Sequence, residues 1–66
     1  MNLMEGILQE IDRNNELIGF YKELGAPGIF AKTMLEHDVK MAKRAIGQNA
    51  DVVDLISIFN KLKGNE

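Results

Sequence analysis

Apolar residues recur at helical spacing in three segments of the chain, at about 3–24, 29–46 and 52–63. Steps of three and four residues run along the first segment through Met4, Ile7, Ile11, Asn14, Ile18 and Tyr21. This is the pattern of a narrow seam along a helix. A second row, Leu17, Phe20 and Leu24, widens the apolar face in the C-terminal half of the segment, so that half should contact more than one neighbour. The pattern predicts an all-α chain.

Turn residues separate the segments. Gly25 supplies a left-handed position at the end of the first helix, and Pro27 cannot continue its hydrogen-bond ladder. Gly47 is expected to close the second helix in the same way, with Asn49 or Asp51 as N-cap of the third. Because short links favour antiparallel packing, we expect one domain over 1–66: a helical hairpin with a shorter third helix folded back across it.

The apolar surface is too wide for one small chain to bury. The second segment has one row at Ala31, Leu35, Asp38 or Val39, Ala42 and Ile46, and an adjoining row at Phe30, Met34, Met41 and Ala45. Apolar residues of the third segment cover roughly 220° of its circumference. A chain of 66 residues buries only about 60% of its unfolded surface, and there is no cysteine for a disulfide. We therefore expect a homo-oligomer, either a dimer or a larger closed assembly.

Charge is unevenly distributed along the chain. The formal net charge is −2, but residues 1–24 carry five acids against two bases, and residues 29–46 carry four bases against two acids. The acidic total argues against a nucleic-acid partner, because such proteins usually present a strongly basic face. The N-terminus lacks the pattern of a signal peptide, and no apolar run approaches the length of a membrane span. These features predict a cytoplasmic protein without a membrane partner.

Asn14 interrupts the apolar seam of the first helix, and two interpretations of it are open. A buried asparagine can hydrogen-bond to its symmetry mate and fix the register of an oligomer. Alternatively the helix rotates slightly and Asn14, like Asn15 beside it, lies in water.

The residue types that carry catalysis are sparse. His37 stands between Glu36 and Asp38, but consecutive helical side chains diverge by about 100°, and metal ligands on one helical face need spacings of three or four. We interpret His37 as a surface or subunit-contact residue. Ser57 lies in mid-helix without a base near it in the sequence. We expect no enzymatic activity, no metal site and no cofactor.

The turn before the second helix offers the best candidate for ligand binding. A helix that opens at Gly28 presents backbone N–H groups with partial positive charge, and Lys32 and Thr33 stand in its first turns. Lys40 extends the basic surface along the same helix, and Tyr21 offers a stacking face for a base. The candidate ligand-binding residues are therefore Tyr21, Gly28, Lys32, Thr33 and Lys40. The alternative is an ordinary helix start, with Tyr21 packed on the seam and the lysines in solvent.

Two stretches resemble small helical proteins carried by phages: Leu24 to Ile46, LGAPGIFAKTMLEHDVKMAKRAI, and Ile58 to Lys63, IFNKLK. In size, helical content and expected oligomerisation the chain is also similar to phage counter-defence sponges. These sequester the cyclic nucleotide messengers of bacterial anti-phage systems such as CBASS. The resemblance to the sponges is architectural, and it implies a compact homo-oligomer that binds messengers between its subunits through aromatic and basic side chains.

Two functions therefore compete. The first is a non-catalytic, phage-type oligomer in the host cytoplasm that sequesters a small anionic nucleotide signal in pockets between subunits. The alternative is a protein interaction module or inhibitor whose apolar helix face docks in a groove on a host protein. A structural component of a virion ranks third.

Overall fold

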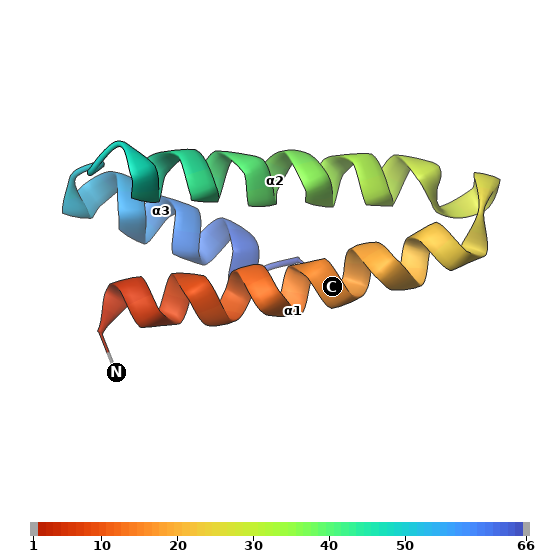
Figure 1. Cartoon of the computed structure of the whole chain (residues 1–66), viewed down its shortest axis with the longest axis horizontal. Helices are drawn as coiled ribbons and strands as arrows, with labels where there is room; N and C mark the ends of the chain where they lie inside the picture. Colours follow the sequence, from red (N-terminus) through yellow and green to blue (C-terminus); the bar gives the residue numbers. More distant parts are fainter. Residues whose placement is uncertain (1, 66) are drawn as a thin grey trace.

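The computed structural model describes residues 2–65 and consists of three α-helices and one short 3₁₀ turn (Figure 1). Helix α1 spans Leu3–Leu24, the turn η1 spans Ala26–Gly28, α2 spans Ile29–Gly47 and α3 spans Val52–Lys63. The part of the chain that the structure describes contains no strand. The predicted all-α class is confirmed, and the predicted helix bounds agree with the structure to within one residue.

Capping residues explain where the helices begin and end. The side chain of Asn2 accepts a hydrogen bond from the Glu5 amide at the start of α1, and Asp51 accepts one from the Asp54 amide at the start of α3. At the end of α1, Gly25 has a φ of 71°, as expected of a glycine that stops a helix. Helix α2 ends at Gly47, but Gly47 does not supply the left-handed position predicted for it, because Asn49 has the positive φ, 53°.

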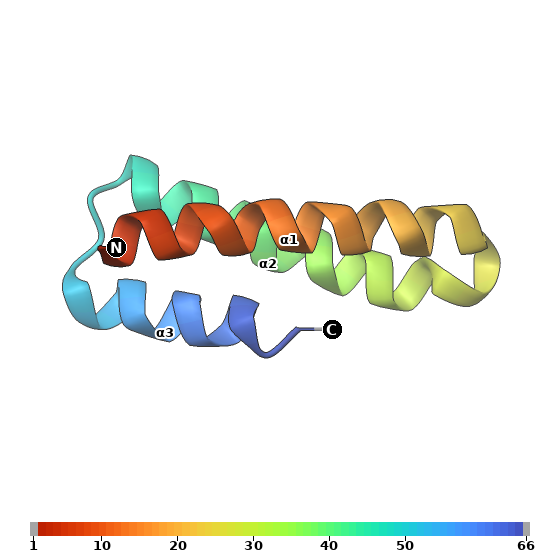
Figure 2. The same ribbon diagram turned by 90° about the horizontal axis from the view of Figure 1, so that it is seen from below.

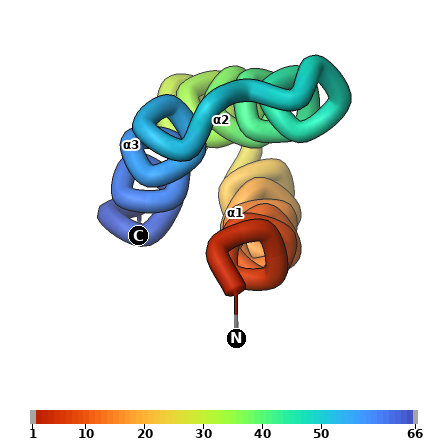
Figure 3. Tube along the Cα trace, turned by 90° about the vertical axis from the view of Figure 1, so that its left-hand side faces the viewer, coloured from red at the N-terminus to blue at the C-terminus, as the bar shows by residue number. Residues whose placement is uncertain are grey.

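Helices α1 and α2 form an antiparallel hairpin, and α3 folds back along one face of it (Figures 1 and 2). Seen from the open end of the hairpin, the three helices surround a common axis (Figure 3). The molecule measures 37 × 20 × 17 Å. Because α3 is much shorter than its neighbours, it covers the half of the hairpin near the open end and leaves the half near the turn bare (Figure 2).

The apolar core lies in the three-helix half. Its buried members are Ile7, Ile11, Val39, Ala42 and Leu62, and partly buried side chains from all three helices pack around them. This cluster draws on the predicted seam of α1 and on the first apolar row of α2. Leu35 is also buried, nearer the hairpin turn.

A buried polar network ties the end of α3 to the middle of the hairpin. Asn14 is fully buried, and its Nδ2 donates to the carbonyl oxygens of Glu10 at 2.7 Å and Leu62 at 3.2 Å. The Nδ2 of Asn65 donates to Asn14 Oδ1 and to Asp38 Oδ2, each at 3.0 Å. Both sequence interpretations of Asn14 are therefore wrong: it is not in water, and its partners belong to its own chain.

Arg13 reinforces this junction from the edge. Its Nη2 donates to the carbonyl oxygens of Leu62 at 2.8 Å and Lys63 at 3.3 Å, while its Nε pairs with Glu10 at 2.9 Å. The last carbonyl groups of a helix have no partner within that helix. Arg13 and Asn14 satisfy two of them for α3, so the position where α3 ends is strongly specified.

Candidate functional site

The half of the hairpin that α3 leaves bare exposes large apolar side chains. The hydrogen bonds of Arg13 and Asn14 place the end of α3 at the middle of α1, and the bond from Asn65 to Asp38 places it at the middle of α2. Beyond this level the hairpin consists of residues 15–24, the turn and residues 29–37, which we call the arm. In Figure 2 the arm extends past the end of α3 with α1 and α2 side by side.

On α1, the side of the arm next to α3 carries large apolar residues. Residues three, four or seven positions apart share a face of a helix. Leu17, Phe20 and Leu24 follow Arg13 by four, seven and eleven positions, and Arg13 contacts α3. The side chain of Phe20 is 58% exposed and that of Leu24 is half exposed. The face that α3 covers near the open end thus continues onto the arm without a helix on it.

On α2 the same face continues in the same way. Asp38 bonds to the C-terminal segment through Asn65, and Met34 and Ala31 precede it by four and seven positions. Phe30 lies one turn before Met34 and is 83% exposed, the most exposed of the large apolar side chains in residues 2–65. Together Leu17, Phe20, Leu24, Phe30, Ala31 and Met34 form what we call the arm face.

A close backbone approach holds the two helices of the arm together at the turn. Gly28 is buried, and a Cβ atom at this position would lie 2.5 Å from the carbonyl oxygen of Tyr21 and 3.2 Å from two further backbone atoms of that residue. The ring of Tyr21 stands edge-on to that of Phe20, with centroids 5.5 Å apart. Tyr21 and Gly28, both predicted as ligand-binding residues, are therefore brought together.

The remaining candidates at the helix start already have partners within the chain. The amide of Gly28 donates to Gly25 and that of Ile29 donates to Ala26, because the turn forms a 3₁₀ helix. The hydroxyl of Thr33 donates to the carbonyl oxygen of Ile29 at 2.9 Å. Lys32 lies 3.9 Å from Glu36 in an ion pair. These contacts leave fewer hydrogen-bond donors at the turn available to an anion.

Lys32 nevertheless borders an open hollow of about 260 Å³ at the tip of the arm. Lys22 lies on its other side, and Gly25, Ala26 and Ile29 complete the lining. Lys22 was not singled out from the sequence, although a signal exists: it stands three residues before Gly25, and Lys32 stands four residues after Gly28. An antiparallel hairpin brings such positions together across its turn.

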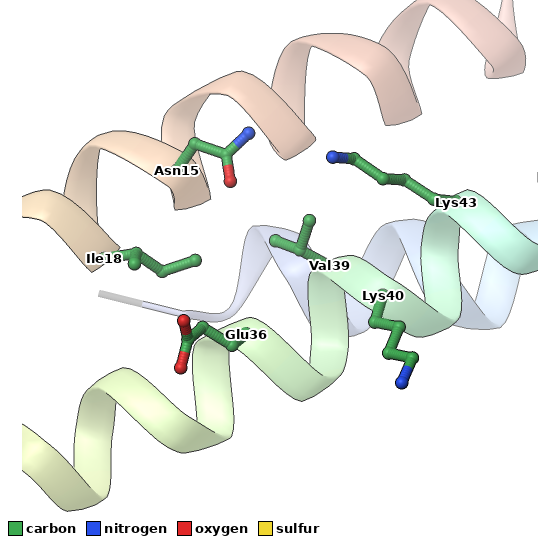
Figure 4. A pocket seen from close by; sticks show the side chains of 6 residues that line it. All are labelled: Asn15, Ile18, Glu36, Val39, Lys40 and Lys43. Carbon is green, nitrogen blue, oxygen red and sulfur yellow. The ribbon is translucent and has the colours of Figure 1, made fainter.

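Lys40 lies elsewhere, along the groove between α1 and α2 on the hairpin face opposite α3 (Figure 4). This groove has a volume of about 320 Å³ and is lined by Asn15, Ile18, Glu36, Val39, Lys40 and Lys43. The amine of Lys40 points away from α1, whereas that of Lys43 reaches across toward Asn15 (Figure 4). The structure thus separates Lys40 from Tyr21 and Gly28. Of the two lysines that line the groove, Lys43 is the one whose amine reaches across it.

His37 is an exposed side chain whose Nδ1 lies 3.6 Å from a carboxylate oxygen of Asp38. Within residues 2–65 no three acidic or histidine side chains gather in a way that would hold a metal ion. None of the three helices combines the length and apolar character needed to cross a lipid bilayer. Comparison of the chain with protein-family models, with curated proteins and with solved structures finds no match.

Proposed function

We propose that this protein is a non-catalytic helix-binding module whose arm face accepts an amphipathic helix. The proposal rests on one observation: the arm face continues the surface of the hairpin on which α3 packs. In one half of the molecule, side chains of α1 and α2 pack against α3. In the other half the same two helices expose the large apolar residues Phe20, Leu24, Phe30 and Met34.

The chemistry of the arm face fits a protein partner. It is made of aromatic, aliphatic and methionine side chains, which are enriched in the centres of protein interfaces. Phe20 and Phe30 project from different helices, so a docked helix would lie between two aromatic anchors. Burying an exposed side chain of this size contributes roughly 1.5–3 kcal/mol, and a few such anchors account for most of the affinity in many interfaces.

Selection from a displayed library of helical peptides tests the proposal. We expect enriched peptides with apolar residues at positions i, i+3, i+4 and i+7, because this spacing places them on one face of a helix. The substitution Phe30→Glu should weaken their binding about 10-fold to 100-fold, since it replaces an apolar anchor worth roughly 1.5–3 kcal/mol. Fluorescence anisotropy with labelled peptides measures the difference.

The neighbouring substitution Ile29→Glu is the matched control. Ile29 is also exposed, at 59%, but it lines the hollow at the tip of the arm and does not belong to the arm face. It should change peptide affinity less than about 3-fold, within the context-dependence of exposed positions. Equal effects at both positions, or a library without enrichment against the monomeric chain, would contradict the proposed function.

A second candidate function is the binding of a small anionic nucleotide at the tip of the arm, enclosed between copies of the chain. The hollow between Lys22 and Lys32, with Ile29 in its lining, supports it. In one chain the hollow is smaller than the roughly 300–1,000 Å³ of typical small-molecule sites, so a second copy would have to complete it. Sequestration of a signalling nucleotide would be the corresponding activity.

Calorimetric titration with a panel of cyclic di- and trinucleotides tests this candidate. A nucleotide that binds should lose at least about 10-fold in affinity in Lys22→Ala and in Lys32→Ala, because each removes a cation at the phosphate and a charged hydrogen bond contributes roughly 1.5–3 kcal/mol. Lys61→Ala, on α3, is the control and should leave affinity unchanged. An absence of heat across the panel would remove this candidate.

A further inference from the structure

The molecule has a second apolar surface that a single chain leaves exposed, on the outer side of α3. Leu62 and Leu55 of this helix point toward the hairpin. Val52, Val53 and Ile56 lie on other sides of the helix, and their side chains are 63%, 74% and 46% exposed. These three residues belong to the first two turns of α3, at the open end of the hairpin. Helix α3 therefore has one side packed and another side available.

We infer that the arm face of each chain is occupied by α3 of a second copy, in a twofold dimer in which each α3 lies between its own hairpin and the partner's arm. This inference rests on the proposed helix-binding function and names the helix that is bound. On α3, Val52, Val53 and Ile56 stay exposed although the opposite side of the helix packs on its own hairpin. One contact, repeated by symmetry, covers both exposed apolar surfaces, as in a closed isologous dimer.

The dimensions of the two elements agree. Residues 15–24 of α1 leave roughly 15 Å of bare face at 1.5 Å per residue, and α3 is roughly 18 Å long, so the two differ by less than one helical turn. Antiparallel stacking of the hairpins is required. If both turns pointed the same way, the two α3 helices would meet at the same half of the dimer and leave both arms uncovered. In the antiparallel arrangement the start of α3 reaches the tip of the partner's arm.

The residues that meet in this arrangement are complementary. Val53, near the start of α3, comes over the first turn of the partner's α2, where Phe30 is exposed. The basic end of α3, with Lys61 and Lys63, comes to the middle of the partner's hairpin, where α1 carries Glu16. Apolar residues therefore meet apolar residues at the tip, and opposite charges meet at the middle.

Complementary single-cysteine variants test the dimer, because the chain has no cysteine of its own. Val53→Cys and Phe30→Cys change exposed side chains, and circular dichroism checks that both variants fold. Mixed and mildly oxidised, the two variants should form a covalent heterodimer at least 10-fold faster than either forms a homodimer. Within one chain the two positions lie near opposite ends of the molecule, beyond the reach of a disulfide. Sedimentation of the wild-type chain should give twice the 7.4 kDa monomer mass.

Three results would overturn the inference: a 7.4 kDa species at all concentrations tested, self-coupling of Phe30→Cys faster than the mixed reaction, or equal rates for all combinations. The second result would mean that the arms of two copies pack on each other. If one of these occurs while selected peptides still bind in a Phe30-dependent manner, the occupant is wrong and the helix-binding function stands. If peptide binding also fails, both proposals fail.

Discussion

Replacing Gly28 with alanine is expected to lower the melting temperature by about 10 °C or more. The added Cβ atom would lie 2.5 Å from the carbonyl oxygen of Tyr21, a distance at which the backbone itself must move. Overpacking costs about 1–3 kcal/mol, and the upper end applies because the contacted atoms belong to the backbone. For a domain of this size each kcal/mol corresponds to roughly 4–8 °C. Thermal unfolding followed by circular dichroism measures the change.

The substitution Gly19→Ala provides the matched control for this prediction. Gly19 lies within α1, and a Cβ atom there meets nothing within 4 Å. Alanine is better than glycine inside a helix by about 0.5–1 kcal/mol, so this variant should be more stable than the wild type. The same chemical change therefore has opposite signs at two positions. A Gly28→Ala variant as stable as the wild type would show that α1 and α2 do not approach so closely at the turn.

The fold followed closely from local features of the sequence. Helix bounds depend on capping residues such as Asn2, Asp51 and Gly25, whose effect is confined to one turn of chain. The apolar spacing identified the buried seam of α1 and the first row of α2 for the same reason. The left-handed position after α2 falls at Asn49 and not at Gly47, because asparagine also tolerates a positive φ.

The candidate site was less predictable because it depends on how helices are placed in space. The period of a helix indicates which residues share a face, but not which face the third helix will cover. The sequence places Lys32 and Lys40 along one basic surface. In the structure Lys32 borders the hollow at the tip of the arm, and Lys40 lies beside the groove between α1 and α2. Phe30 and Met34 were recognised as a second apolar row. Their exposure follows from the position at which α3 stops, which depends on contacts between residues about fifty positions apart.

The polar junction that fixes this stopping point should be the most sensitive part of the molecule. The substitution Asn14→Asp keeps the size of the side chain but replaces the Nδ2 donor with a carboxylate oxygen. That oxygen would face the carbonyl oxygens of Glu10 and Leu62, both acceptors. Leaving buried acceptors without a donor costs about 1–3 kcal/mol, and more where a charge is buried. We therefore expect a loss of about 3 kcal/mol or more, a large part of the stability of so small a domain.

Asn15→Asp introduces the same charge one residue away, on an exposed side chain, and should change the free energy of unfolding by less than about 0.5 kcal/mol. Urea titration of both variants at neutral pH measures the contrast. Acidification should reduce the difference in free energy of unfolding between the two variants, because a protonated carboxyl at position 14 regains an O–H donor for the carbonyl oxygen of Leu62. Because Asn14 holds the end of α3, the substitution should also loosen Leu62 and Asn65 first, visible as faster amide exchange in the last turn of α3. Equal stabilities for the two variants would mean that the end of α3 is not anchored through Asn14.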